Sequence, residues 1–390
     1  MAKKKEEPKQ EQDKTLDSKQ ILGGILKEKE YKDAHLNPYQ RVDWRISSGS
    51  LILDTYLGGG IGPSLLRMCG QNNEGKTPQT LEILRQFLAT VANSKGFWVV
   101  AEGRGLSDEN KARCGLKFVY SADEWEVGTV FILESNIYEL FINTVKRLVK
   151  NNEEGIRFCF VIDSIDGLML QADADKEINE NNLVAGAPKL SKKLLQNLSL
   201  GMFKFGHLMI MISQVTAAIK TDMYERSPNR GGDFSGGNSL LHGADWIFEY
   251  QKTGRKDYVY DTANGEWAKE KPHAKTLGKI ARVTLMKAAL EASRYHTIEY
   301  PIKFGRKPSG VWLEKEIIDK LLEYGLITQK ASWLAWEDSL LTELQTKFPE
   351  IEKQVQGFHK MLQYLEANLA LRDYLYPKVL AFSKAMLVGE

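Results

Sequence analysis

Residues 70–77 read Gly70-Gln71-Asn72-Asn73-Glu74-Gly75-Lys76-Thr77 and match the phosphate-binding loop pattern of glycine, four residues, glycine, lysine and serine or threonine. In such a loop the backbone N–H groups surround a polyphosphate, Lys76 contacts the outer phosphates and the Thr77 hydroxyl is a magnesium ligand. The flanking residues predict a strand over 65–69 and a helix over 79–92, whose N-terminus favours anions. An ordinary glycine-rich turn is the alternative, and the strand–loop–helix context disfavours it.

The composition is that of a protein with a full hydrophobic core. The chain has 390 residues, of which 43% are hydrophobic and 27% charged, which suits one large domain with one or two small ones. Its formal net charge of +2 is too small to indicate a nucleic-acid partner by itself. Cys69, Cys114 and Cys159 lie in or beside apolar runs without metal-ligand spacing, which predicts reduced core cysteines of a cytosolic protein. No apolar run is long enough to span a membrane and no signal peptide is recognisable, so we expect no membrane partner.

Three apolar segments each end at a polar residue. Glu102 follows the segment 96–101, Asp163 follows 158–162, and Gln214 follows 207–213. Near-continuous apolar runs are typical of strands that are buried on both faces of a parallel sheet. Helical patterns over 136–150 and 189–203 alternate with these strands, so we predict an α/β fold with a mainly parallel central sheet flanked by helices. Since ligands bind at the carboxyl ends of such strands, the three polar residues should lie near the phosphate loop.

The chemistry of these three residues suits a nucleotide site. Asp163 ends a strand that we expect beside the loop strand, where a carboxylate holds magnesium directly or through water. Glu102, on another strand expected beside the loop strand, suits the base that orients and deprotonates an attacking water. Gln214 carries both a donor and an acceptor, so it can sense a γ-phosphate. The alternative is that each carboxylate only caps the end of its strand. This alternative explains a single such residue well, but it explains less well why three buried strands all end in a polar residue.

Two long polar segments follow two of these strands. The first, over 172–187, is rich in Asp, Glu and Asn, and the second, over 215–235, contains basic residues and a glycine-rich end. Long loops that leave one edge of a sheet are usually functional. After the first segment, Lys189, Lys192 and Lys193 share one face of the predicted helix, and a solvated basic face is the alternative to a binding surface there.

The segment before the phosphate loop carries a family resemblance. It contains Ser48-Gly49-Ser50-Leu51, Leu53-Asp54 and Leu57-Gly58-Gly59-Gly60, and the phosphate loop follows ten residues later. Together with that loop, these motifs resemble the RecA recombinases, a group that includes the phage UvsX proteins. The resemblance extends over about residues 46–327 and implies a RecA-like P-loop ATPase core.

The resemblance implies the same roles for the strand-end residues as their chemistry does. It makes Glu102 the catalytic glutamate and Gln214 the switch glutamine, and it places Asp163-Ser164 at the end of the magnesium strand. Lys287 corresponds to the first of two cations that reach across to the ATP of a neighbouring subunit, and so counts among the catalytic residues.

Two positions depart from the family. The second trans-acting cation is replaced by Ala289, and Asn110 stands where the family usually has a tyrosine that stacks on adenine. Asn110 therefore remains the candidate neighbour of the base. Both departures bear on the efficiency of hydrolysis.

The resemblance also implies that the two polar loops bind DNA. Residues 236–238 repeat the Gly-Gly-Asn that ends the second loop in the family, and their N–H groups would contact phosphates together with basic side chains. Apolar side chains at two positions would lie between base triplets. The implied DNA-binding residues are Val184, Lys189, Lys192, Lys193, Ile219, Lys220, Arg226, Arg230, Gly236, Gly237 and Asn238.

Composition and hydrophobic pattern divide the whole chain into four predicted segments. Residues 1–15 are predicted to be a disordered tail, and 16–44 a short amphipathic helix with a linker, which is a candidate for oligomerisation. The ATPase core would span 45–305, and short strands over 245–304 should extend its sheet in antiparallel fashion. Residues 306–390 are predicted to form a small helical C-terminal domain.

The resemblance, together with these motifs, implies an ATP-dependent recombinase that polymerises on single-stranded DNA and promotes homologous pairing and strand exchange in recombination and repair. It would hydrolyse ATP to ADP and phosphate when bound to DNA, with ATP and Mg²⁺ as cofactors. The expected partners are single-stranded DNA, homologous duplex DNA, further copies of the chain in a helical filament, and mediator and single-strand-binding proteins. The expected location is the cytoplasm of a bacterial cell or a phage-infected host.

Two alternatives stay open. One is a RecA-fold motor or regulatory ATPase without strand exchange, which the paired loops and the Gly-Gly-Asn motif disfavour. The other is a nucleotide-switched scaffold that coats single-stranded DNA, which the departures at Asn110 and Ala289 keep open.

Overall fold

The chain forms two compact units, residues 1–40 and residues 41–390. The computed structural model describes residues 18–28, 43–103, 105–152, 155–174, 201–216, 233–234, 243–260, 275–288, 290 and 293–388. In the first unit, helix α1 (Ser18–Ile25) has no buried residue. Its apolar side chains Ile21, Leu22 and Ile25 are exposed, so its apolar face has no cover within the described part of that unit.

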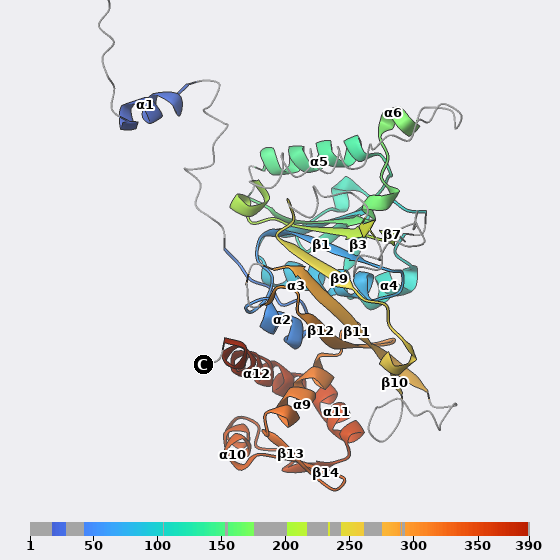
Figure 1. Cartoon of the computed structure of the whole chain (residues 1–390), viewed down its shortest axis with the longest axis vertical. Coiled ribbons are helices and arrows are strands. Elements are labelled where there is room, and N and C mark those ends of the chain that lie inside the picture. Colours follow the sequence, from blue (N-terminus) through green and yellow to red (C-terminus); the bar gives the residue numbers. More distant parts are fainter. Residues whose placement is uncertain are drawn as a thin grey trace, which may run out of the picture. The chain divides into compact units, whose positions relative to one another are not determined.

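The second unit is built on a ten-stranded sheet (Figure 1). The strand order is β10-β11-β9-β1-β6-β5-β2-β4-β3, and β12 pairs with β11. The bounds are β1 (Ser64–Gly70), β2 (Ser94–Val100), β3 (Lys117–Val119), β4 (Thr129–Glu134), β5 (Arg157–Asp163), β6 (Leu208–Ser213), β9 (Trp246–Tyr250), β10 (Tyr258–Tyr260), β11 (Thr276–Lys287) and β12 (Thr297–Lys303). All strands from β9 to β3 in this order are paired in parallel, whereas β10, β11 and β12 are antiparallel. The predicted α/β fold with a mainly parallel sheet is therefore confirmed.

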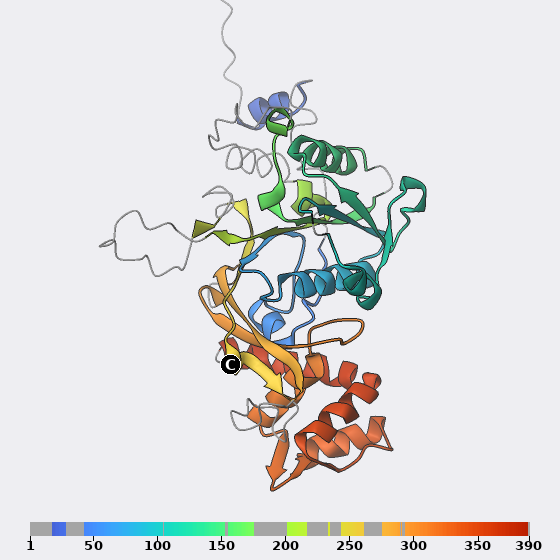
Figure 2. The same cartoon turned by 90° about the vertical axis from the view of Figure 1, so that its right-hand side faces the viewer.

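Helices cover both faces of this sheet (Figure 2). Helix α3 (Lys76–Thr90) packs into the core on one face and α5 (Tyr138–Lys150) into the core on the other. Adjacent residues of β1 alternate between them, with Met68 in the α3 core and Cys69 in the α5 core, because strand side chains have a period of two. Burial on both faces explains why these strands are almost wholly apolar. The remaining elements of this part are α2 (Leu51–Tyr56), α4 (Asp108–Arg113), η1 (Ala122–Glu124), η2 (Ile165–Gly167), α6 (Gln171–Ala174), β7 (Val215–Thr216), β8 (Asp233–Phe234) and η4 (Arg255–Asp257).

Cys69, Cys114 and Cys159 are all free and buried, as predicted. Of the helices within the described ranges, none has the length and apolar character needed to cross a membrane.

Our predictions about strand neighbours were wrong in two respects. Neither the strand before Asp163, β5, nor the strand before Glu102, β2, lies beside β1, whose neighbours are β6 and β9. The strand β9 pairs with β1 in parallel, whereas we predicted an antiparallel extension from this point. An apolar run indicates burial on both faces of a sheet, but it contains no information about which strand lies next to it.

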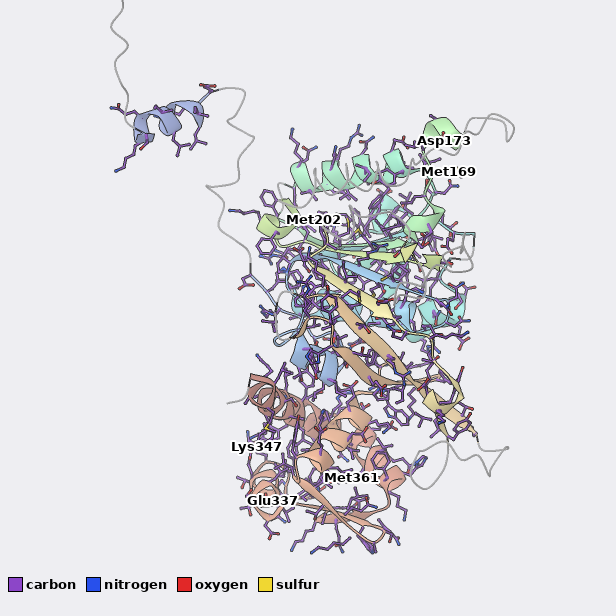
Figure 3. The ribbon with its side chains drawn as sticks, viewed as in Figure 1. Met169, Asp173, Met202, Glu337, Lys347 and Met361 are labelled. Carbon is purple, nitrogen blue, oxygen red and sulfur yellow. The ribbon has the colours of Figure 1, made fainter. Side chains whose placement is uncertain are left out.

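The C-terminal part contains a small sheet as well as helices. Its elements are α9 (Leu313–Glu323), β13 (Ile327–Lys330), β14 (Trp333–Trp336), α10 (Asp338–Lys347), β15 (Gln354–Gln356), α11 (Phe358–Ala367) and α12 (Leu369–Val388). The three strands form an antiparallel sheet that the sequence did not predict. Figure 3 shows Met361 among the side chains between these elements, and it is fully buried there. Because residues 41–390 form one compact unit, a domain boundary near 305 stays a prediction.

Two buried carboxyl groups lie where the C-terminal helices meet α2. Glu316 of α9 accepts hydrogen bonds from Ser50 Oγ and from the backbone N–H of Ile52, both at 2.9 Å. Asp54 of α2 accepts from Ser48 N at 2.7 Å and from the Tyr376 hydroxyl of α12. Burial raises the pKa of Glu316 to about 8 and raises the pKa of Asp54 as well. The contact between the core and the C-terminal helices is therefore sensitive to protonation.

We predict that Glu316→Gln changes how stability depends on pH. The folded-state pKa of Glu316, about 8, lies above the ordinary value of 4.5 that the carboxyl has in the unfolded chain. Between these values the folded chain holds a proton that the unfolded chain has released, so stability is lost as pH rises through this window. Relative to Glu316→Gln, the wild-type free energy of unfolding, measured by urea denaturation, should fall by on the order of 5 kcal/mol across the window. The exposed Glu323→Gln on the same helix is the control, and identical pH profiles for all three proteins would contradict the prediction.

A candidate nucleotide-binding site

The phosphate-loop motif lies between the end of β1 and the start of α3, as predicted. Gly75 caps the helix with φ at +106°, and Gly70 has φ at +150°, conformations that favour glycine. A Cβ atom at Gly70 would also lie 2.6 Å from the carbonyl oxygen of Tyr250. The Lys76 ammonium folds back and donates to the carbonyls of Gly70 and Gln71, at 2.6 and 2.7 Å. The loop is therefore a closed turn with its lysine drawn inward.

Lys76 and Asp163 influence each other electrostatically. Burial lowers the pKa of Lys76, and the charge of Asp163 opposes that change. Burial and the nearby charge of Glu102 raise the pKa of Asp163 to about 6, while Lys76 opposes the rise. Although β6 separates their strands, the two side chains therefore lie within electrostatic reach of each other. Thr77, the other predicted metal-binding residue, is half-buried in the first turn of α3.

Glu102 and Gln214 meet at the carboxyl edge of the sheet. Gln214 Nε2 donates to Glu102 Oε1 at 3.2 Å, and the Ser164 hydroxyl donates to the same oxygen. The backbone N–H of Gln214 donates to Asp166 Oδ2 at 2.6 Å. The structure thus brings Glu102, Asp163 and Gln214 to one edge, as their positions at strand ends predicted. Our sequence reasoning missed Asp166, which lies one turn beyond β5 without a motif of its own.

A second group of side chains holds the phosphate loop from the antiparallel end of the sheet. Glu74 Oε2 accepts from Thr253 Oγ1 at 2.7 Å and lies 3.4 Å from Lys279 Nζ, on β11. Lys279 also donates to the carbonyl of Asn73. These contacts join residues about two hundred positions apart, so no local pattern could have predicted them. Strand β11 also contains Arg282 and Lys287, so nothing in the sequence distinguishes Lys279 from the other basic residues of the strand.

Asn110, the candidate neighbour of the base, lies in α4 and accepts from Arg113 at 2.6 Å. It lines a small pocket together with Pro78, in the first turn of α3, and Pro308. Because α3 begins at Lys76, this pocket opens beside the same helix N-terminus as the phosphate loop. The pocket has a volume of only about 20 Å³, which is too small for a base, and Asn110 lacks the aromatic ring that would stack on one.

Lys287 lies at the far edge of the sheet from its own phosphate loop. It pairs with Ile247 of β9, and its charge opposes the rise in the pKa of Asp245 that burial causes. Asp245 in turn accepts from the N–H of Leu65, at the start of β1, at 2.7 Å. Since Gly70 ends the same strand about 17 Å further on, Lys287 does not reach the phosphate loop of its own chain.

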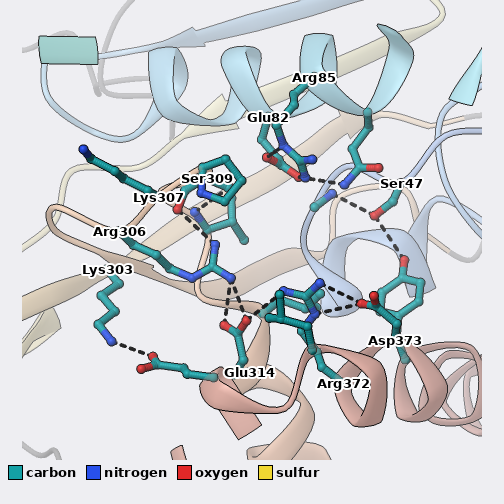
Figure 4. Close-up of a pocket in the computed structure, with 18 of the residues that line it drawn as sticks. Ser47, Glu82, Arg85, Lys303, Arg306, Lys307, Ser309, Glu314, Arg372 and Asp373 are labelled. Carbon is teal, nitrogen blue, oxygen red and sulfur yellow. Dashed lines mark hydrogen bonds and ion pairs between the residues drawn. The ribbon is translucent and has the colours of Figure 1, made fainter. Parts of the chain in front are cut away.

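A larger cavity, of about 750 Å³, lies between α3 and the C-terminal helices (Figure 4). Its wall contains Arg306 and Arg372, which both pair with Glu314, and Lys303, which pairs with Glu366. None of the predicted nucleotide-site residues lines it, but it shares Glu82, Pro308 and Ser309 with the small pocket beside Asn110.

Several predicted residues lie outside the part of the chain that the structure describes. They are Val184, Lys189, Lys192, Lys193, Ile219, Lys220, Arg226, Arg230, Gly236, Gly237, Asn238 and Ala289. Of the two predicted DNA loops, over 172–187 and 215–235, the structure describes only the part within α6 and the antiparallel pair β7–β8.

The fold is a RecA-like α/β core with a phosphate-loop motif at the carboxyl edge of its sheet. No protein-family model matches the chain. The chain is 25% identical over 348 residues to Protein RecA of Pseudomonas fluorescens (strain Pf0-1), which covers 88% of this chain and 86% of that protein. It is 23% identical over 336 residues to Protein RecA of Borrelia duttonii (strain Ly), covering 86% and 79%, and 24% identical over 345 residues to DNA repair protein recA homolog 1, chloroplastic, of Arabidopsis thaliana, covering 88% and 66%. Similarity over most of the chain supports a relationship to RecA proteins.

Proposed function

We propose that the chain is an ATP-dependent recombinase of the RecA type, from a phage or a bacterium, that polymerises on single-stranded DNA and promotes homologous pairing and strand exchange. The observation that carries this proposal is the meeting of Glu102, Asp163 and Gln214 at the edge where the phosphate loop begins. Similarity to RecA proteins over 88% of the chain supports it. The activity would take place in the cytoplasm, with mediator and single-strand-binding proteins as further partners.

The chain's own residues suit the hydrolysis of ATP. Lys76 would leave the loop carbonyls and contact the outer phosphates, because a bound polyphosphate offers its charge a stronger partner. Glu102 would orient the attacking water and accept its proton. Gln214 shares a hydrogen bond with Glu102, so a change at the γ-phosphate would be transmitted to the segment that follows β6.

Thr77 and Asp163 fit a magnesium ion that arrives with the nucleotide. Mg²⁺ prefers oxygen ligands and is usually held by one or two carboxylates together with phosphates and water. The pKa of Asp163, about 6, leaves its carboxyl mostly ionised at neutral pH and able to act as such a ligand. The ion would supply positive charge at the phosphates.

The two segments that would bind DNA leave the sheet beside this site. One follows β5 and η2, which contain Asp163 and Asp166, and the other follows Gln214 and β7. Both therefore begin at residues that contact each other, since Gln214 N donates to Asp166. Binding of nucleotide and binding of DNA would be coupled through this contact.

Assembly into a filament would complete the site. Lys287 lies away from its own phosphate loop, which suits a cation that acts on the ATP of a neighbouring subunit. The exposed apolar face of α1 would supply a further contact between subunits. A RecA-fold motor or regulatory ATPase would hydrolyse ATP without forming filaments on DNA, and a scaffold would form filaments with little hydrolysis.

The first test is ATP turnover with and without single-stranded DNA, together with negative-stain electron microscopy. We expect DNA to stimulate hydrolysis and ATP to produce filaments on it. Lys76→Ala should abolish turnover with an unchanged circular dichroism spectrum, because it removes the charge that compensates the outer phosphates. Lys117→Ala, on the exposed edge strand β3, is the control. Unchanged hydrolysis in Lys76→Ala would show that the loop is not the active site, and filaments with hardly any turnover would favour the scaffold.

A second prediction concerns the base. Glu102→Gln should bind ATP almost normally but hydrolyse it about 10²–10⁴ times more slowly, the usual effect of a positioned base. Single-turnover kinetics separate the two steps, and the exposed Glu109→Gln is the matched control. Loss of binding with a normal rate per bound ATP would instead make Glu102 a structural residue.

A third prediction tests the action of Lys287 across the subunit contact. Lys287→Ala should suppress hydrolysis and filament formation while the isolated subunit still binds ATP, because a cation supplied in trans stabilises charge on the transferring phosphoryl group. Mixing it with Lys76→Ala should restore part of the activity, since some junctions then combine an intact loop with an intact Lys287. If the mixture assembles but stays inactive, Lys287 does not act in trans and Arg294 becomes the candidate.

A further inference from the structure

The phosphate loop contains an acidic side chain, Glu74, directly before its second glycine. Glu74 is buried, with 8% of its surface exposed. A carboxylate at this position would repel the phosphates of a nucleotide unless its charge is compensated. The structure shows how that compensation is made.

Glu74 is held by two residues from the antiparallel end of the sheet. Its Oε2 accepts from Thr253 N at 3.2 Å and from Thr253 Oγ1 at 2.7 Å, and it lies 3.4 Å from Lys279 Nζ. Lys279 is 7% exposed and also donates to the carbonyl of Asn73. One buried ammonium therefore contacts both a backbone oxygen and the carboxylate of the phosphate loop.

The position of Lys279 on β11 is fixed by strand pairing. It lies opposite Ile302 of β12, and the side chain of Ile302 lies close to the phosphate loop, where a Cβ atom at Gly75 would be 2.8 Å from its Cδ1. Lys287 lies eight residues further along β11, about 26 Å away on an extended strand. Strand β11 thus carries one lysine to its own phosphate loop and another to the opposite edge.

We propose that Lys279 is a positioning residue of the nucleotide site, which neutralises Glu74 and thereby sets the affinity of the loop for a nucleoside triphosphate. This inference rests on the proposed function. Lys279 acts through Glu74 and the Asn73 carbonyl. Lys279 compensates the negative charge of Glu74 near the bound phosphates, whereas Lys76 binds the phosphates directly.

Neutralisation and simple bracing of the loop have different consequences. If the ion pair between Lys279 and Glu74 only stabilised the conformation of the loop, removal of either side chain would weaken nucleotide binding to a similar extent. If Lys279 neutralises Glu74, removal of the lysine leaves a buried unpaired carboxylate beside the phosphates, whereas removal of the carboxylate leaves a cation that attracts them. The two single variants therefore change affinity in different directions.

The experiment compares Lys279→Met, Glu74→Gln and the double variant in the full chain, with Mg²⁺–ATP as the probe and Kd measured by calorimetry. Lys279→Met should weaken binding about ten- to hundredfold, with a smaller effect on kcat than on KM. Glu74→Gln should bind as tightly as the wild type or tighter, and the double variant should recover to within about threefold of the wild type. Arg282→Met is the matched control, because it removes ion pairs to Asp257 and Glu299 from the same strand and should leave Kd unchanged.

The outcomes separate this inference from the proposed function. A wild-type protein that binds no ATP would overturn both. A wild-type protein that binds ATP, with equal losses in the two single variants or without recovery in the double variant, would overturn only the role of Lys279. If Lys279→Met fails to fold by circular dichroism, Glu74→Gln alone decides, and a tenfold loss of affinity in that variant contradicts neutralisation.

Discussion

The close approach of the phosphate loop to the strands behind it determines how the elements around the loop pack. A Cβ atom at Gly70 would lie 2.6 Å from the carbonyl oxygen of Tyr250, and one at Gly75 would lie 2.8 Å from Ile302. The loop is therefore confined by β9 and β12, strands far from it in the sequence. Its shape is a property of the whole sheet, and the antiparallel strands are as necessary to it as β1 and α3.

Charge at the carboxyl edge follows from this packing. Burial brings Lys76, Asp163 and Glu102 into a region where each alters the ionisation of its neighbour. On the other flank, Lys279 and Glu74 are both less than a tenth exposed and compensate each other. This compensation of buried charges stabilises the loop on one flank, while the Lys76 ammonium binds the carbonyls of Gly70 and Gln71 on the other.

The sequence was sufficient where the physical signal is local. Periodicity and the loop motif predicted α3, the buried strands and the edge at which Glu102, Asp163 and Gln214 meet. The sequence was insufficient to predict which strands pair with each other. Strands β5 and β6 are both apolar and differ little in composition, so their order relative to β1 can be read only from the folded sheet, where β6 lies beside β1. The hold of Lys279 on Glu74 and the small C-terminal sheet depend on similar long-range pairings.

The buried carboxyl groups between α2 and the C-terminal helices bear on how far the chain can be shortened. Leu51 of α2 belongs to the hydrophobic core of the C-terminal part, and Tyr376 of α12 covers Asp54. A protein truncated after β12 would expose this apolar surface together with an acid that is now wholly buried. We therefore regard the C-terminal helices as a structural part of the α/β core, and their removal would leave an apolar, aggregation-prone surface.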